Sequence, residues 1–356
     1  MKKKLSILLA LVMTCSLFVA CGKNNTSTDS TSTPKTSSTA TPSPEADENK
    51  DKVEQNSSEE VTVRVGSMKG PTTMGLLNLQ SKAEAETAGQ PYEFTMVTAA
   101  DELVSKVVGG ELDIALVPAN MASVLYNKTQ SGISVIDINT LGVLYIAASD
   151  DTITSMEDLK GRTLYLTGKG TTPDYALQYL LKQNGLTTED VTLEYKSEAA
   201  EVASVLSQQA DAVGLLPQPF ATVACQQNEA LKIVLNLTEE WDKVSDGSSL
   251  VTGVTIVKND FLTEHPDAVA TFMEEHKESS EYANTNVDET AEAVAAAGII
   301  EKAPVAAKAI PFCNITYIDG ADMKTKLSGY LQTLFDLDPS SVGGTLPADD
   351  FYYLPQ

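Results

Sequence analysis

The stretch "VGSMKGPTTMGLLNL", Val65–Leu79, decides the fold, because an apolar alternation runs into a Gly, Pro and Thr loop that opens a helical pattern. The stretch "YLTGKGTTPDYALQYLL", Tyr165–Leu181, repeats the same order further along the chain. A strand, a polar loop and a helix start form the repeating unit of an α/β sheet. Two copies therefore predict two α/β lobes of similar build.

The alternation of strands and helices continues around both copies. "GELDIALVPANMASVL" overlays "QQADAVGLLPQPFATVA", so that Asp113 matches Asp211 and Pro118 matches Pro217. Short apolar strands between amphipathic helices are typical of parallel-type sheets covered on both faces. The alternative is a chance likeness between βα units. The main helical patterns are expected over 72–88, 101–108, 172–183, 199–208, 220–227, 266–282, 287–297 and 321–335.

The first sixty residues do not read as a globular fold. Three lysines and a short apolar run over 1–20 predict a signal peptide. The leader ends in "SLFVACGKNN", which resembles the lipobox of bacterial lipoproteins and implies a lipidated Cys21, with plain secretion or an uncleaved anchor as the alternatives. Residues 21–60 are almost free of large apolar side chains, so a disordered tether on the outer side of the cell membrane is expected.

The composition excludes several functions. A formal charge of −24 argues against nucleic acid as a partner. His265 and His276, eleven residues apart on one expected helix, would lie about 16 Å apart, too far to share a metal ion. Cys225 and Cys313 read as two buried thiols, and no nucleophile motif or P-loop is present. We therefore expect no enzyme, no cofactor and no metal.

An ordered set of motifs resembles a known family. "RVGSMKGPTTMGL", "GELDIALVPANMA", "DLKGRTLYLTGKGTTPDYALQYLLKQNGL", "LLPQPFATVA" and "NDFLTEHPDAVATFMEEH" are similar to the substrate-binding lipoproteins of ABC importers, in the group with nitrate, sulfonate, taurine and thiamine-precursor binders. The resemblance implies a type II periplasmic-binding-protein fold, with lobe 1 at 61–147 plus 252–356 and lobe 2 at 148–251, joined by crossing hinge strands. It also implies a monomer that delivers a small polar or anionic solute to permease and ATPase subunits.

The resemblance also implies a ligand site on the loops that follow the strands of both lobes. The loops are expected to face each other across a cleft and to grip the solute with backbone amides and hydroxyls. Glycines that merely form turns, threonines that cap helices and prolines that end strands are the plainer readings. The expected ligand-facing residues are Gly70, Pro71, Thr72, Thr73, Pro118, Ala119, Asn120, Gly170, Thr171, Thr172, Pro217, Gln218 and Pro219.

Further side chains are weaker candidates. Lys69 and Lys169 are either anion contacts or solvated surface lysines. The two arginines, Arg64 and Arg162, lie outside the expected loops, which makes an amino acid a less favoured ligand. The aromatic residues that would either stack a heterocycle or pack in the core are Tyr126, Tyr145, Tyr175 and Trp241.

Two other functions fit the same fold. One is an enzyme related to thiamine-precursor synthesis or to a dehydratase of menaquinone biosynthesis. The other is a sensor or adhesion lipoprotein that does not transport. The lipid anchor and the absence of histidine from the expected loops favour the transport receptor.

Overall fold

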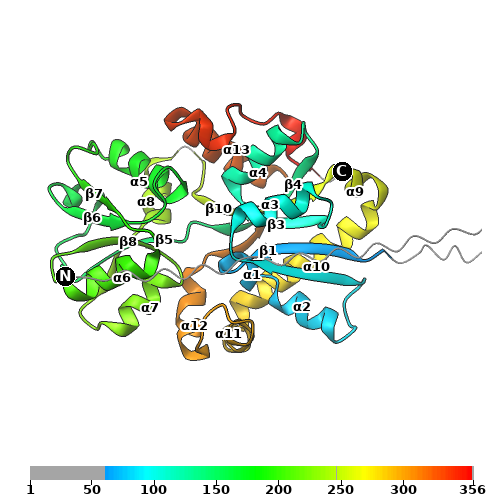
Figure 1. The fold of residues 1–356 in the computed structure, drawn as a ribbon, viewed down its shortest axis with the longest axis horizontal. Coiled ribbons are helices and arrows are strands. Elements are labelled where there is room, and N and C mark those ends of the chain that lie inside the picture. Colours follow the sequence, from blue (N-terminus) through cyan, green and yellow to red (C-terminus); the bar gives the residue numbers. More distant parts are fainter. Residues whose placement is uncertain (1–60, 246, 355–356) are drawn as a thin grey trace, which may run out of the picture. The chain divides into compact units, whose positions relative to one another are not determined.

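The computed structural model describes residues 61–245 and 247–354. The expected signal peptide, Cys21 and the tether lie outside the described residues. Within them, the strands form one six-stranded and one five-stranded sheet (Figure 1), which we call the sheets of the first and second lobe. The first has the order β11-β4-β10-β3-β1-β2, and the second has the order β7-β6-β8-β5-β9.

The strands of the first lobe are β1 (Val63–Met68), β2 (Tyr92–Val97), β3 (Ile114–Pro118), β4 (Ile133–Leu141), β10 (Val251–Lys258) and β11 (Ile315–Ile318). Its helices are α1 (Pro71–Met74), α2 (Leu77–Glu84), α3 (Ala100–Val108), α4 (Ala119–Lys128), α9 (Asn259–Glu264), α10 (Pro266–Thr285), α11 (Val287–Ala296), α12 (Ala303–Ala309) and α13 (Gly320–Leu337). The 3-10 turns η2 (Ile310–Phe312), η3 (Pro339–Val342) and η4 (Asp349–Phe351) complete this lobe.

The strands of the second lobe are β5 (Leu144–Ala148), β6 (Thr163–Leu166), β7 (Thr192–Tyr195), β8 (Val213–Pro217) and β9 (Lys232–Asn236). Its helical elements are η1 (Met156–Leu159), α5 (Thr172–Gln183), α6 (Ala199–Gln208), α7 (Phe220–Gln227) and α8 (Leu237–Val244). The expected fold class, two similar α/β lobes, is confirmed by this arrangement.

Each sheet is mixed and not purely parallel. β1 pairs in parallel with β2 and β3, as β6 does with β7 and β8. One strand in each sheet runs against its neighbours: β10 is antiparallel to β3 and β4, and β5 is antiparallel to β8 and β9. These are the strands at which the chain passes from one lobe to the other. The first passage comes earlier than the expected boundary after residue 147, because β5 already pairs in the second sheet from Leu144.

The helix expected over 72–88 is broken in two. α1 ends at Met74 and α2 begins at Leu77. At the break, a Cβ on Gly75 would lie 3.1 Å from Ile315 and 3.2 Å from Ser280, so glycine allows the close approach of β11 and α10. The Ser279 hydroxyl donates to the Gly75 carbonyl oxygen at 2.6 Å and holds the kink in place.

Candidate functional site

The loop after β1 is closed by its own side chains. The hydroxyls of Thr72 and Thr73 both donate to the Met68 carbonyl oxygen, the first at 2.9 Å. Gly70, which precedes α1, has φ 143° and ψ −155°, and a Cβ on it would meet nothing within 4 Å. A side chain at Gly70 would therefore project into open space although the residue itself is buried, whereas the two threonine hydroxyls are engaged within the loop.

The residues expected after β3 are engaged within the lobe. Pro118 ends the strand opposite Gly253 of β10, and the Ala119 side chain is buried. The Asn120 amide donates to the Ser341 carbonyl oxygen at 3.2 Å. The structure thus gives Asn120 a role in fixing the C-terminal segment against α4.

The loop before α5 is satisfied by an internal carboxylate. The Gly170 amide donates to Asp174 Oδ2 at 2.8 Å, and the Thr171 hydroxyl donates to the Gly168 carbonyl oxygen at 2.6 Å. Asp174 is buried and also accepts hydrogen bonds from Gln178 and Tyr195. Because this carboxylate already occupies the start of α5, the loop before α5 differs from the Gly70 loop after β1.

Thr172 and the expected residues after β8 lie in different surroundings. Thr172 lies next to Tyr330 of α13. Burial raises the pKa of the Tyr330 hydroxyl, and the nearby Thr172 side chain partly offsets this rise. Gln218 is buried next to Pro217, and its backbone N–H donates to the Val143 carbonyl oxygen at 2.8 Å. Pro219 follows through a cis peptide bond and leads directly into Phe220 at the start of α7.

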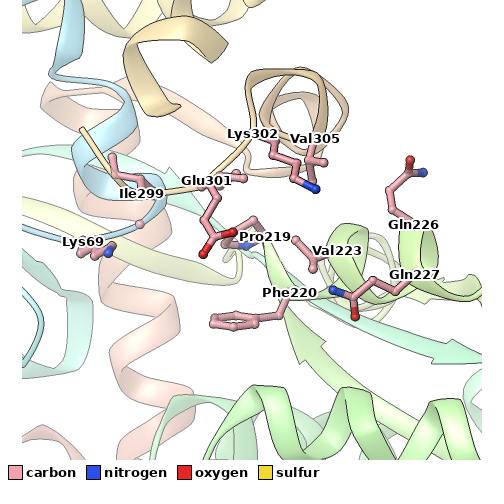
Figure 2. A pocket seen from close by; sticks show the side chains of 12 residues that line it. Lys69, Pro219, Phe220, Val223, Gln226, Gln227, Ile299, Glu301, Lys302 and Val305 are labelled. Atoms are coloured by element: carbon pink, nitrogen blue, oxygen red, sulfur yellow. The ribbon is translucent and has the colours of Figure 1, made fainter. Parts of the chain in front are cut away.

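A cleft of about 680 Å³ is lined by residues of two of these loops, the one with Gly70 and the one with Pro219 (Figure 2). The first lobe contributes Lys69, Gly70, Ile299, Ile300, Glu301, Lys302 and Val305. The second lobe contributes Pro219, Phe220, Val223, Gln226 and Gln227. Gly70 and Pro219 are thus the expected residues that line this cleft. In this cleft the Gly70 loop shares the lining with the Pro219 loop. Gly170, which was expected to face Gly70, is not in the lining.

A third segment of the cleft lining, residues 299–305, was not expected from the sequence. It joins α11 to α12, and Gly298 turns the chain there with φ 67°. Lys308 of α12 extends the contact to the second lobe, because its Nζ lies 2.6 Å from Gln226 Oε1 on α7. The available signal was the apolar "GII" run between two helical patterns, which nothing in the sequence links to Gly70.

Phe220 is the aromatic residue of this cleft, with 43 % of its surface exposed. The four aromatic residues considered from the sequence are not in its lining, and each has a packing role instead. The hydroxyls of Tyr126, Tyr145 and Tyr175 bond Asp350, the Phe312 carbonyl oxygen and Asp338 respectively, and the Trp241 indole donates to Ser248 at 3.1 Å.

The two loop lysines differ. Lys69 lines the cleft, whereas Lys169 Nζ lies 5.3 Å from the centre of the Tyr195 ring, outside the lining. Both arginines are paired away from the cleft, Arg64 with Asp113 and Arg162 with Asp150.

The remaining reactive side chains lie outside the cleft lining. His265 precedes α10, while His276 is fully buried within it. Cys225 is half-buried and Cys313 buried, both as free thiols. Across residues 61–245 and 247–354, no group of His, Cys, Asp or Glu side chains is arranged to hold a metal ion. None of the helices described is both long and apolar enough to cross a bilayer.

Comparison with known proteins supports the interpretation of the fold. The family model described as NMT1/THI5 like matches residues 119–290. A comparison with curated proteins finds no match. An ABC transporter structure from Parabacteroides distasonis superimposes with a TM-score of 0.70 at 24% identity, covering 83% of this chain and 99% of that one.

Two further solved structures share the fold. The periplasmic aliphatic sulphonate binding protein SsuA from Escherichia coli gives a TM-score of 0.65 at 15% identity, over 83% of this chain and 92% of its own. The Candida albicans CA3427 gene product, which has the generic periplasmic binding protein fold, gives 0.54 at 18% identity, over 82% and 93%. The resemblance to the binding-protein group and the periplasmic-binding-protein fold are thereby confirmed.

Proposed function

We propose that this chain is the solute-binding component of an ABC importer, which captures a small polar or anionic solute in the cleft between its lobes and delivers it to a permease. The observation that carries the proposal is the cleft of about 680 Å³, whose walls come from both lobes of a periplasmic-binding-protein fold. A solute that contacts both walls binds better when the lobes are close, so it stabilises the closed state.

The cleft favours binding over catalysis. Its lining holds two lysines, one carboxylate, two glutamines and an exposed phenylalanine ring, but no histidine, cysteine, serine or threonine. A nucleophile paired with a base is the usual requirement for covalent catalysis. The names of the similar structures, an ABC transporter and a sulphonate binding protein, support the same assignment.

A thermal-shift screen of the mature protein tests the proposal. Nitrate, aliphatic and aromatic sulfonates, pyrimidines and other small polar solutes would be added one at a time. A ligand at a hundred times its Kd adds about 2.7 kcal/mol to the free energy of unfolding, so a genuine ligand raises Tm clearly. If no solute raises Tm and native mass spectrometry finds no co-purified solute, the proposal is wrong.

Anchoring is part of the same proposal. We infer that Cys21 is lipidated and holds the folded residues at the outer face of the cell membrane, with the chain acting as a monomer. Mass spectrometry of the mature N-terminal peptide should show an acylated Cys21. Replacement of Cys21 by Ser should release the protein from the membrane fraction.

A further inference from the structure

The charges of the cleft are all on the wall of the first lobe. They belong to Lys69, Glu301 and Lys302, while the wall of the second lobe is neutral. Within the described part of the chain, no ion pair engages these three side chains. The cleft lining therefore holds one exposed carboxylate and two exposed ammonium groups, none of them in an ion pair, that a solute can meet.

Glu301 is placed to meet whatever Lys69 binds. Figure 2 shows its carboxylate pointing into the space between Lys69 and Phe220, whereas Lys302 points away from Lys69. Gly70 leaves room beside Lys69, because a side chain at this position would project into open space. A solute with an acidic group on Lys69 thus has Glu301 on one side and the exposed Phe220 ring on another.

Glu301 works against a solute that is only acidic. Like charges brought close together raise the free energy of the complex, which gives discrimination against the wrong ligand. A solute that also carries an ammonium, amidinium or ring N–H group turns the same carboxylate into a charge-assisted hydrogen-bond acceptor.

We propose that Glu301 is a specificity-determining residue that selects amphoteric solutes, in which an acidic group meets Lys69 and a cationic or N–H donor meets Glu301. An apolar or flat body lies over Phe220. This inference rests on the proposed function, and it adds the requirement for the donor group and the residue that imposes it.

Three probes with one ring scaffold test the inference by titration calorimetry on the mature chain. They are 4-(aminomethyl)benzoate, which is amphoteric, 4-methylbenzoate, which has only the acid, and 4-methylbenzylamine, which has only the amine. We expect the amphoteric probe to bind at least about tenfold more tightly than either of the others, because it makes both charge-assisted contacts.

Substitutions assign the preference to its residue. Glu301→Gln should reduce the preference for the amphoteric probe over 4-methylbenzoate by about tenfold, since the acid-only probe no longer meets a like charge. Lys69→Gln should weaken both acid-bearing probes. Glu292→Gln is the matched control, because Glu292 is an exposed glutamate of α11 outside the cleft lining.

The outcomes separate the two proposals. Equal binding of 4-methylbenzoate and the amphoteric probe, or an unchanged preference in Glu301→Gln, overturns the role of Glu301 and leaves solute binding standing. Tight binding of acid-only solutes in the broader thermal-shift screen has the same meaning. Failure of every probe and every screened solute to bind overturns both.

Discussion

Gly70 shows how a single backbone position shapes the cleft. With φ at 143° and ψ at −155°, it occupies a region that is essentially restricted to glycine. We expect Gly70→Ala to lower the free energy of unfolding by about 1–3 kcal/mol through backbone strain. The same substitution should weaken binding of the solute found in the screen, because the loop at the cleft must shift. Urea unfolding and calorimetry measure the two effects.

Gly344 provides the control for Gly70. It also has a positive φ, 92°, and a Cβ on it would meet nothing within 4 Å, but it lies outside the cleft lining. Gly344→Ala should cost stability and leave solute binding unchanged. An unfolding midpoint for Gly70→Ala equal to that of the unmodified protein would contradict the strain argument.

Cys313 and Cys225 should react at different rates. Burial raises the pKa of the Cys313 thiol to about 12, and it also raises the pKa of the half-buried Cys225 thiol. Alkylation needs the thiolate, and burial disfavours the thiolate most at the fully enclosed Cys313. Iodoacetamide should therefore modify Cys225 first, as read by peptide mass spectrometry. In urea both should react alike, and equal rates in the folded protein would be the contrary result.

At this scale the sequence located the loops better than the contacts. Gly70 and Pro219, each in a loop after a strand, line the cleft, and their contact with a solute stays a prediction. Thr72 and Asn120 have the right chemistry for a ligand, but their side chains bond Met68 and Ser341. A hydroxyl or amide next to a loop has several partners within reach, and only the folded backbone decides which one it takes.

Among the elements, a fully buried polar cluster joins β4, β10 and α10. Asp137 of β4 accepts a hydrogen bond from the Thr255 hydroxyl of β10 at 2.8 Å and lies 3.3 Å from His276 Nδ1 of α10. Asp137→Ala should lower the free energy of unfolding by about 2–5 kcal/mol, because the buried Thr255 hydroxyl loses its acceptor and His276 Nδ1 loses its polar partner. Asp137→Asn keeps an acceptor for Thr255 and should cost less. Urea denaturation measures both, and a loss near zero for the alanine variant would contradict this role.

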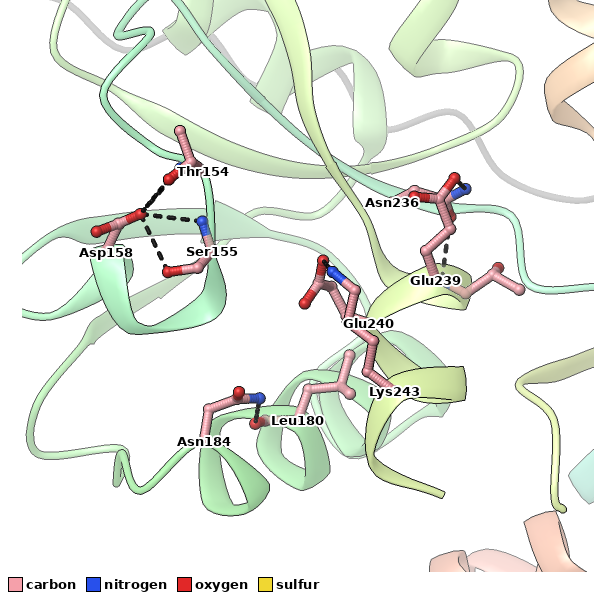
Figure 3. A network of polar contacts seen from close by, with 10 residues as sticks. Thr154, Ser155, Asp158, Leu180, Asn184, Asn236, Glu239, Glu240 and Lys243 are labelled. Carbon is pink, nitrogen blue, oxygen red and sulfur yellow. Dashed lines mark hydrogen bonds and ion pairs between the residues drawn. The ribbon is translucent and has the colours of Figure 1, made fainter. Parts of the chain in front are cut away.

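The start of α8 depends on its capping residue (Figure 3). The Asn236 side chain accepts from the Thr238 amide at 3.0 Å and donates to Glu239 at 3.0 Å. Asn236→Ala should lower the free energy of unfolding by about 1 kcal/mol, and Asn236→Ser by less, because serine also caps helices. The control is Lys243→Ala on the same helix, which breaks only the partly exposed pair with Glu240 and should change stability by at most about 1 kcal/mol. Equal losses for Asn236→Ala and Asn236→Ser would show that the cap is not the cause.

Elements were predictable where the pattern was local. β1, β3, β6, β8 and α5 lie within a few residues of the expected positions, since apolar periodicity and loop residues mark their ends. The break at Gly75 depends on α10 and β11, which lie more than two hundred residues later in the chain. The wall over 299–305 also depends on a long-range contact, so periodicity alone did not indicate it.

For the described residues as a whole, the internal repeat is the strongest sequence signal. The two sheets share one topology: β2-β1-β3-β10-β4 corresponds to β7-β6-β8-β5-β9, with the crossing strand antiparallel in each. The likeness of the two loop and helix starts was sufficient to predict this duplication. The antiparallel positions of β5 and β10, at which the chain passes between the lobes, were not predictable from local pattern. The apolar pattern of a buried strand does not depend on its direction in the sheet.

Helices of the two lobes contact each other at two places, and the two contacts differ in kind. On one side α13 packs on α5 and α8, where the rings of Trp241 and Tyr330 lie 5.7 Å apart and both are fully buried. On the other side α12 meets α7 through the exposed bond from Lys308 to Gln226. A buried aromatic seam is costlier to separate than an exposed polar contact. We therefore expect the lobes to pivot near α13 and to open at the α7 and α12 side.

Trp241 tests this pivot, because it is the only tryptophan of the chain and all indole emission comes from it. If the seam with Tyr330 stays packed while the cleft opens, acrylamide should quench the emission poorly in the solute-free protein and equally poorly after the solute is added. Tyr330→Ala removes the α13 ring that packs on Trp241, while the Tyr179 ring stays in place. This variant should increase quenching and shows that the assay responds to opening of the seam. Strong quenching of the solute-free protein that the solute suppresses would mean that the lobes separate at α13, and the pivot would then lie at the α12 side.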